Sequence, residues 1–169
     1  MQQTVRIEKL TLNFGAGKDQ ARLEKGAALI QSIAGIKPVR VATKKRIPAW
    51  GLRPGLPIGA KLTLRGQEAS AMLSRTLFAR DFKLPASTLD NHGNLSFGIK
   101  EYIDIENAAY DPAIGILGLE VSVTLSKPGS RVKHRAIRAT SLGKRQAVTR
   151  DEAQAFLSKN FKATFGETP

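Results

Sequence analysis

Apolar and polar residues alternate along several short segments of this chain, which is the pattern of strands with one buried face. The alternation predicts strands over residues 4–13, 58–64, 95–105 and 116–125. Elsewhere the apolar residues recur at helical spacing, which predicts one helix from the N-cap Asp19 to Gly35 and another over residues 67–82. The mixture indicates an α+β fold, in which an antiparallel sheet carries helices on one face and leaves the other face free to bind.

The C-terminal part of the chain has a different pattern. A turn at residues 127–129 precedes a basic stretch with little apolar periodicity, and a capping box from Thr149 to Glu152 then opens a final helix. We therefore expect a core domain of residues 1–126, from which a basic loop at residues 42–55 protrudes. Residues 127–169 are expected to form a basic extension that ends in a helix packed on the core.

Composition excludes several classes of protein. The chain has 169 residues and a mass of 18.3 kDa, which suffices for one domain with a buried core. It contains no cysteine, so disulfides, thiolate metal sites and a thiol nucleophile are excluded. No run approaches the roughly 20 apolar residues of a membrane span, and the first nine residues do not resemble a secretory signal. Membrane and secreted proteins are therefore disfavoured.

Positive charge is the strongest compositional signal. The chain carries 27 Lys and Arg against 14 Asp and Glu, and residues 37–65 and 127–150, which contain no acid, hold 16 of those 27 cations. A compact fold repels itself at such an excess unless a polyanion neutralises it. The segregation predicts two basic faces or arms that bind nucleic acid, and an unevenly charged solvated surface is the alternative.

Catalytic sites find little support in the sequence. A glycine-rich turn before Lys18 lacks the spacing of a phosphate-binding P-loop. His92 lies in a turn and is expected to be an exposed turn residue. In a strand, Asp104 and Glu106 would share one face while Glu101 points to the other, so a solvated sheet edge explains these carboxylates. We expect no enzyme, metal, cofactor or small-molecule substrate.

The basic loop is the most specific feature. It combines cations, rigid prolines and the only tryptophan of the chain. An indole or guanidinium there could stack on a base or ribose while the lysines meet phosphates. A buried, structural Trp50 is the alternative, and the two roles can coexist. The residues of the loop that we expect to contact RNA are Thr43, Lys44, Lys45, Arg46, Trp50 and Arg53.

Strings along nearly the whole chain resemble one known family. They are Ile7–Lys9, Leu12–Gly17, Gly35–Pro38, Thr43–Gly55, Pro57–Gly66, Gly93–Glu101 and Tyr110–Pro112. In this order they resemble the universal large-subunit ribosomal protein L-five family, which binds 5S ribosomal RNA. The missing N-terminal helical extension and the basic tail after Lys127 resemble the archaeal and eukaryotic type.

The resemblance implies a structural component of the central protuberance in the cytoplasmic ribosome, whose sheet and adjoining loops bind 5S RNA. Asn13 and Thr63 match the family's RNA-contacting residues. Ile36 stands where the family often has glutamine, so an amide contact is lost there. The same resemblance implies that the basic loop reaches the P-site transfer RNA and large-subunit RNA. It also implies contacts with neighbouring ribosomal proteins, including a small-subunit head protein.

Residue chemistry supports the same function, because short polar groups can engage 2′-hydroxyls or base edges while cations bind phosphates. The residues expected to bind 5S RNA are Arg6, Asn13, Lys37, Lys61, Thr63 and Arg65. In the extension, the residues expected to reach ribosomal RNA are Arg131, Lys133, His134, Arg135, Arg138, Lys144 and Arg145. One alternative is a basic architectural protein without a ribosomal role, which should bind B-form DNA as well as RNA. An RNA-modifying enzyme would need a catalytic site, and the sequence offers none.

Overall fold

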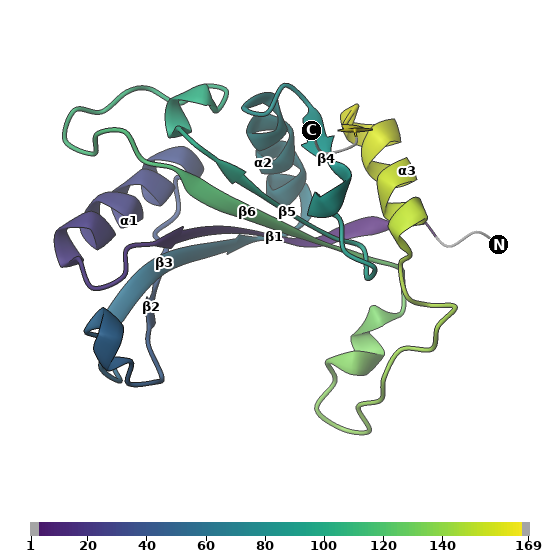
Figure 1. The fold of residues 1–169 in the computed structure, drawn as a ribbon. Coiled ribbons are helices and arrows are strands. Elements are labelled where there is room, and N and C mark those ends of the chain that lie inside the picture. Colours follow the sequence, from purple (N-terminus) through teal and green to yellow (C-terminus); the bar gives the residue numbers. More distant parts are fainter. Residues whose placement is uncertain (1–3, 167–169) are drawn as a thin grey trace.

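A five-stranded antiparallel sheet forms the centre of the protein, whose computed structural model describes residues 4–166 (Figure 1). Along the sheet the strands follow the order β2-β3-β1-β6-β5. Their bounds are Val39–Ala42 (β2), Pro57–Leu64 (β3), Arg6–Gly15 (β1), Leu119–Ser126 (β6) and Asn94–Ile99 (β5). Every neighbouring pair is antiparallel, so β1 begins at the end of the sheet where β3 and β6 finish.

Two helices, α1 (Gln20–Ala34) and α2 (Gly66–Phe78), cover the same face of the sheet (Figure 1). The N-terminus of α1 is capped as its sequence predicts, because the Asp19 side chain accepts a hydrogen bond from the Arg22 backbone at 3.1 Å. Gly26 allows this helix to approach the sheet. A Cβ atom there would overlap the ring of Phe14, so any larger residue would push the helix away.

A third helix, α3 (Arg150–Phe161), lies on the same side of the sheet as the other two (Figure 1). The predicted capping box is formed, and Ala153 and Leu157 are fully buried in the common core. The chain then continues into β7 (Thr164–Gly166), which pairs in parallel with β4 (Lys83–Pro85). The C-terminal helix is thus part of the core that supports the sheet.

The predicted fold class is confirmed. The strands predicted over residues 4–13, 58–64 and 116–125 correspond to β1, β3 and β6, and the helix from Asp19 to Gly35 corresponds to α1. Within residues 4–166, no helix combines the length and the apolar character needed to cross a membrane.

The predicted strand over residues 95–105 is wrong beyond Ile99. Residues Tyr102–Asp104 form a helical turn, because the Tyr102 ring is buried to 1% exposure and its hydroxyl accepts a hydrogen bond from the Asp111 backbone at 2.8 Å. The expectation that Asp104 and Glu106 share a strand face is therefore also wrong. These residues belong to an irregular loop between β5 and β6.

Other boundaries also differ from the prediction. Helix α2 ends at Phe78 instead of residue 82, because Asp81 and Phe82 take positive φ values of 50° and 58° that turn the chain into β4. Three strands were not predicted from the sequence, namely β2, whose four side chains are mostly exposed, and the three-residue strands β4 and β7. Segments this short carry too few alternations to predict a strand.

Candidate nucleic-acid interface

The face of the sheet opposite the helices carries rows of short polar side chains. Apolar residues of β1 such as Leu10 and Leu12 are fully buried beneath the helices, so the residues between them point the other way. The rows run across β3, β1, β6 and β5. One row is Thr63-Thr11-Ser122-Ser96, the next is Lys61-Asn13-Glu120-Gly98, and the last, without β3, is Lys9-Thr124-Asn94. We call these residues the open face.

Side-chain hydrogen bonds link neighbouring strands across the open face. The Asn13 amide donates to a carboxylate oxygen of Glu120 at 2.9 Å, and the Ser96 hydroxyl donates to Ser122 at 3.2 Å. The Asn13 contact ties the single carboxylate of the rows to a neighbouring amide. The face therefore offers hydroxyls, two amides and two lysines at strand spacing, a chemistry suited to 2′-hydroxyls and phosphates.

The six residues predicted to bind 5S RNA lie in three places. The open face holds three of them, namely Asn13, Lys61 and Thr63. Arg6 and Arg65 line a cavity at the end of the sheet where β1 begins. Lys37 lies in the turn between α1 and β2 and lines a hollow against α1, on the helix side of the sheet. In the same turn the Ile36 side chain is 41% exposed.

Apart from Thr63, the hydroxyl residues of the open face were not predicted from the sequence. Thr11 pairs with both Thr63 and Ser122, and Ser96 continues the row. A usable signal was present, because the polar positions of the alternating strands must share one face once the apolar positions are buried. Which strand lies next to which cannot be inferred from alternation alone, so the row itself could not be assembled.

The basic loop is an ordered hairpin that extends β2 and β3. The backbones of Thr43 and Leu56 are hydrogen-bonded at 2.9 Å, and Ile47 and Leu52 pair across the tip. Leu52 is buried, whereas Trp50 is 67% exposed. The alternative of a buried Trp50 is therefore wrong. The loop presents its indole and all of its cations to solvent.

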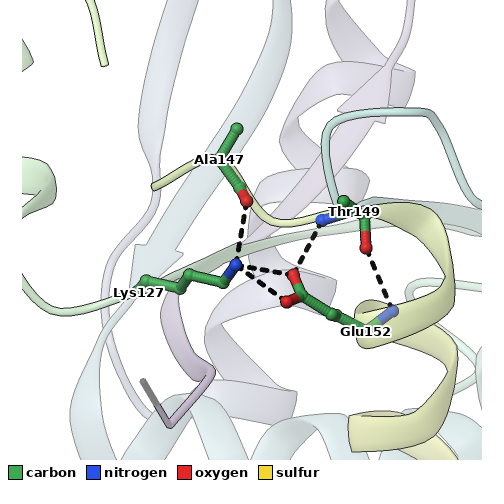
Figure 2. A network of polar contacts seen from close by, with 4 residues as sticks. All are labelled: Lys127, Ala147, Thr149 and Glu152. Atoms are coloured by element: carbon green, nitrogen blue, oxygen red, sulfur yellow. Dashed lines mark hydrogen bonds and ion pairs between the residues drawn. The ribbon is translucent and has the colours of Figure 1, made fainter. Parts of the chain in front are cut away.

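The basic extension is closed at its base by a polar network (Figure 2). The Lys127 ammonium, only 8% exposed, lies 2.7 Å from one carboxylate oxygen of Glu152 and 3.0 Å from the carbonyl of Ala147. The hydrogen bond from Lys127 and one from the Thr149 backbone lower the pKa of Glu152 below its ordinary range. Lys127 counts among the 16 segregated cations, but this pairing removes it from the surface that could meet a phosphate.

A second acid holds the extension to the sheet. The Glu8 carboxylate lies 3.5 Å from the imidazole of His134 and 3.9 Å from the ammonium of Lys133. Both residues were predicted to contact RNA, and the structure turns them toward a carboxylate. The other five predicted cations of the extension are exposed, and they are Arg131, Arg135, Arg138, Lys144 and Arg145.

The basic loop and the basic extension both project from the side of the sheet opposite the helices, at opposite ends (Figure 1). The open face therefore lies between two cationic arms. Four acids, Glu101, Asp104, Glu106 and Asp111, lie in the loop of residues 100–118, at the far end of the sheet from the extension. Across the described residues, no three His, Asp or Glu side chains gather in a way that could hold a metal ion.

Two family models match the chain. The model described as "Ribosomal protein L5" matches residues 1–53, and a second model, which describes the C-terminus of the same ribosomal family, matches residues 57–165. The chain belongs to the ribosomal protein L5 family. The predicted resemblance is thereby confirmed, and the two matches together run from residue 1 to residue 165, with only a short gap where the basic loop returns to β3.

Curated relatives support the same family over nearly the full chain. The protein is 43% identical over 164 residues to the large ribosomal subunit protein uL5 of Sulfurisphaera tokodaii, a match that covers 96% of this chain and 93% of that protein. It is also 43% identical over 161 residues to the uL5 of Sulfolobus acidocaldarius, with coverages of 95% and 90%. Both organisms are archaea, in agreement with the predicted type.

Membership of the L5 family also settles the question of enzyme or binding protein. The matched relatives are ribosomal proteins and not enzymes, so the carboxylates and histidines need no catalytic explanation. The rival prediction of an RNA-modifying enzyme is set aside on this ground.

Proposed function

We propose that this protein binds 5S ribosomal RNA through the open face and forms part of the central protuberance of the large ribosomal subunit. The observation that carries the proposal is the row of threonine and serine hydroxyls beside Asn13 and Lys61, free of large apolar side chains and flanked by two cationic arms. Hydroxyls and amides engage 2′-hydroxyls and base edges, while the arms supply the phosphate contacts.

Replacing Asn13 and Thr63 together by alanine should weaken 5S RNA binding by about 2–4 kcal/mol, because directional contacts to RNA are lost. The loss includes a second effect, since removal of the Asn13 amide frees the Glu120 carboxylate to repel phosphates. The measurement is a binding titration with 5S RNA, with transfer RNA and duplex DNA as competitors, at two salt concentrations. Circular dichroism should show an unchanged fold.

A matched control replaces Ser74 and Gln154 by alanine. Both are exposed and lie on helices α2 and α3, away from the open face, so 5S affinity should not change. An unchanged affinity in the Asn13 and Thr63 variant would remove both residues from the site. Wild-type binding that is equal for all three nucleic acids, and collapses together as salt rises, would favour the architectural protein instead.

We further propose that the basic loop contacts the P-site transfer RNA and nearby large-subunit RNA. Its exposed Trp50 can stack on a base while Lys44, Lys45 and Arg46 meet phosphates. Changing these three cations to alanine should spare 5S binding but impair translation by assembled ribosomes. Because Trp50 is the only tryptophan, its fluorescence reports on the loop alone. If this variant failed to bind isolated 5S RNA, the assignment of 5S RNA to the sheet and of transfer RNA to the loop would be contradicted.

The remaining cations of the extension are proposed to contact large-subunit RNA.

A protein partner, such as a small-subunit head protein, needs a different surface. The loop of residues 100–118 is suited to one, because it combines acids with the exposed side chains of Tyr110 and Ile116, at 55% and 63% exposure. Acids repel RNA, and exposed apolar groups favour contact with a protein of positive charge.

A further inference from the structure

One carboxylate, that of Glu8, makes every charged contact between the sheet and the basic extension within residues 4–166. Its Oε2 lies 3.9 Å from the Lys133 ammonium, and its Oε1 lies 3.5 Å from the His134 imidazole. The Glu8 side chain is 17% exposed, whereas those of Lys133 and His134 are 37% and 60% exposed. The acid is therefore mostly covered, while both of its partners remain accessible from solvent.

A β-bulge fixes Glu8 at this place. The register between β1 and β6 shifts between Ile7 and Lys9, which leaves Glu8 as the extra residue of β1. Bulges of this kind re-aim a side chain and recur beside functional sites. The Arg65 guanidinium also donates a hydrogen bond to the Glu8 carbonyl at 3.4 Å. Because the sheet itself makes these contacts, Glu8 keeps its position whether or not the extension moves.

The extension has few other attachments to the sheet. In the described part of the chain, the hydrogen bonds of residues 131–146 stay within the extension, and none of these residues is buried. The pair of Lys127 with Glu152 fixes where the segment begins and ends, but not how the rest of it lies. The contacts of Glu8 therefore set the position of residues 131–146 against the sheet.

These contacts are of a kind that a phosphate can replace. A carboxylate and a phosphate offer the same anionic oxygens to an ammonium or an imidazole, so the two compete for one cation. Residues 127–150 contain no acid of their own, so the sheet supplies their counter-charge through Glu8. Ion pairs of partly exposed side chains are weak, because solvent and salt screen them. A polyanion such as RNA should therefore displace Glu8 from its partners.

We propose that Glu8 occupies the place of an RNA phosphate in the free protein, and that the extension exchanges this carboxylate for a phosphate when RNA binds. Before binding, Glu8 holds the extension against the sheet and withholds Lys133 and His134 from RNA. The contact is thus autoinhibitory. The inference rests on the proposed function, since it requires that the extension bind RNA, and it adds the two residues that face an acid in the free chain.

The first test uses Lys133→Ala and an RNA duplex of arbitrary sequence, because contacts with phosphates need no particular sequence. Binding by the full chain is titrated over a series of salt concentrations. If the exchange occurs, the variant loses one phosphate contact, so the slope of log affinity against log salt should fall in magnitude by about one. The matched control is Lys25→Ala, which removes an exposed cation from α1, on the helix side of the sheet, and should keep the wild-type slope.

The second test uses Glu8→Gln, which keeps the shape of the side chain and removes its charge. RNA no longer has to displace a carboxylate, so affinity for the duplex should rise about two- to fivefold. Without RNA, limited proteolysis should cleave residues 131–146 faster than in the wild type. Asp81→Asn is the control, because it removes an exposed carboxylate in the turn after α2, and it should raise affinity by less than about twofold.

An unchanged salt slope in Lys133→Ala would overturn the inference, because Lys133 would then stay with Glu8 in the complex. Equal or weaker RNA binding by a folded Glu8→Gln would also overturn it, since the contact would then be purely structural. Lys133→Ala tests the exchange even if Glu8→Gln fails to fold.

Binding of 5S RNA by the same preparations separates this inference from the proposed function. The duplex carries phosphates without the fold of 5S RNA. Exchange on the duplex without a preference for 5S RNA would keep the role of Glu8 and overturn the 5S assignment. Recognition of 5S RNA with an unchanged slope in Lys133→Ala would leave the proposed function standing alone.

Discussion

The basic loop and the basic extension both carry positive charge to the same side of the sheet, but different interactions hold them in shape. Backbone hydrogen bonds close the loop, at Thr43 with Leu56 and again at Ile47 with Leu52. The base of the extension is closed by side chains, through the ion pair of Lys127 with Glu152 (Figure 2). The loop therefore depends on its local sequence, whereas the base of the extension depends on an ion pair between residues 25 positions apart.

The Glu152 carboxylate takes part in several of the contacts that close the base of the extension. It pairs with the buried Lys127 ammonium, accepts from the Thr149 backbone at 3.1 Å and completes the cap of α3. Removing one partner of a buried pair costs more than the pair contributes, because the remaining charge stays buried without compensation. A single substitution at Glu152 should thus loosen the base of the extension, whereas no single side chain has this role in the loop.

The largest expected effect on stability is that of Glu152→Ala. We expect the free energy of unfolding to fall by about 2–3 kcal/mol, from the stranded Lys127 ammonium and the lost cap. Urea denaturation of the purified chain measures this change. Limited proteolysis should at the same time show new cleavage within residues 127–150, while the basic loop remains as resistant as in the wild type.

Asp151→Ala is the matched control, because Asp151 also lies in the first turn of α3 but is exposed and forms no ion pair in the described structure. Its effect should stay below about 0.5 kcal/mol. Equal losses in the two variants would mean that helix-terminal charge, and not the pair with Lys127, stabilises the base of the extension.

The same division between local and distant interactions explains how much of the fold was predictable. The helix caps at Asp19 and Thr149 each depend on residues within four positions of sequence, and both predicted helix starts are confirmed. The end of β5 at Ile99 was not predictable, because it depends on the burial of Tyr102 and its contact with Asp111. The sequence pattern does not mark this end of the strand, because the end depends on the packing of Tyr102 and not on the alternation of apolar and polar residues.

The candidate site divides in a similar way. Asn13, Lys61 and Thr63 were named from the sequence, and they lie on one face. The hydroxyl row that joins them required the strand order, which is a property of the whole sheet. The contact of Glu8 with His134 required both a bulge and a tertiary contact, so neither residue's local sequence could indicate it.

A smaller effect is expected on the pH dependence of the free energy of unfolding. The pKa of Glu152 is lower in the folded chain than its ordinary value of 4.5, so the stability that it contributes is present above that pH and is lost as the pH falls through the folded pKa. Glu152→Gln should therefore flatten the decline of stability below about pH 4.5, by less than ~1 kcal/mol because the carboxylate is partly solvated. Urea titrations between about pH 6 and pH 3 measure this slope.

Asp90 contributes to the same acid range and provides the control. Burial opposes the change, but hydrogen bonds from Asn94 and His92 outweigh it and lower the pKa of Asp90. Asp90→Asn should flatten the same part of the curve without loosening the extension. If Glu152→Gln left the slope unchanged while Asp90→Asn abolished it, the acid sensitivity would belong to the turn before β5 alone.

The smallest effect is expected in the basic loop, at Thr43. Its hydroxyl donates to the carbonyl of Lys45 at 3.0 Å and accepts from the same backbone at 3.4 Å, so it braces the entry to the hairpin. Thr43→Ala should cost only about 0.5 kcal/mol, because the flanking backbone hydrogen bonds remain and solvent can replace the hydroxyl. Thr43→Ser keeps the hydroxyl and should be neutral. A loss in Thr43→Ala as large as that of Glu152→Ala would show that the loop, like the extension, depends on one side chain, and the contrast between the two arms would fail.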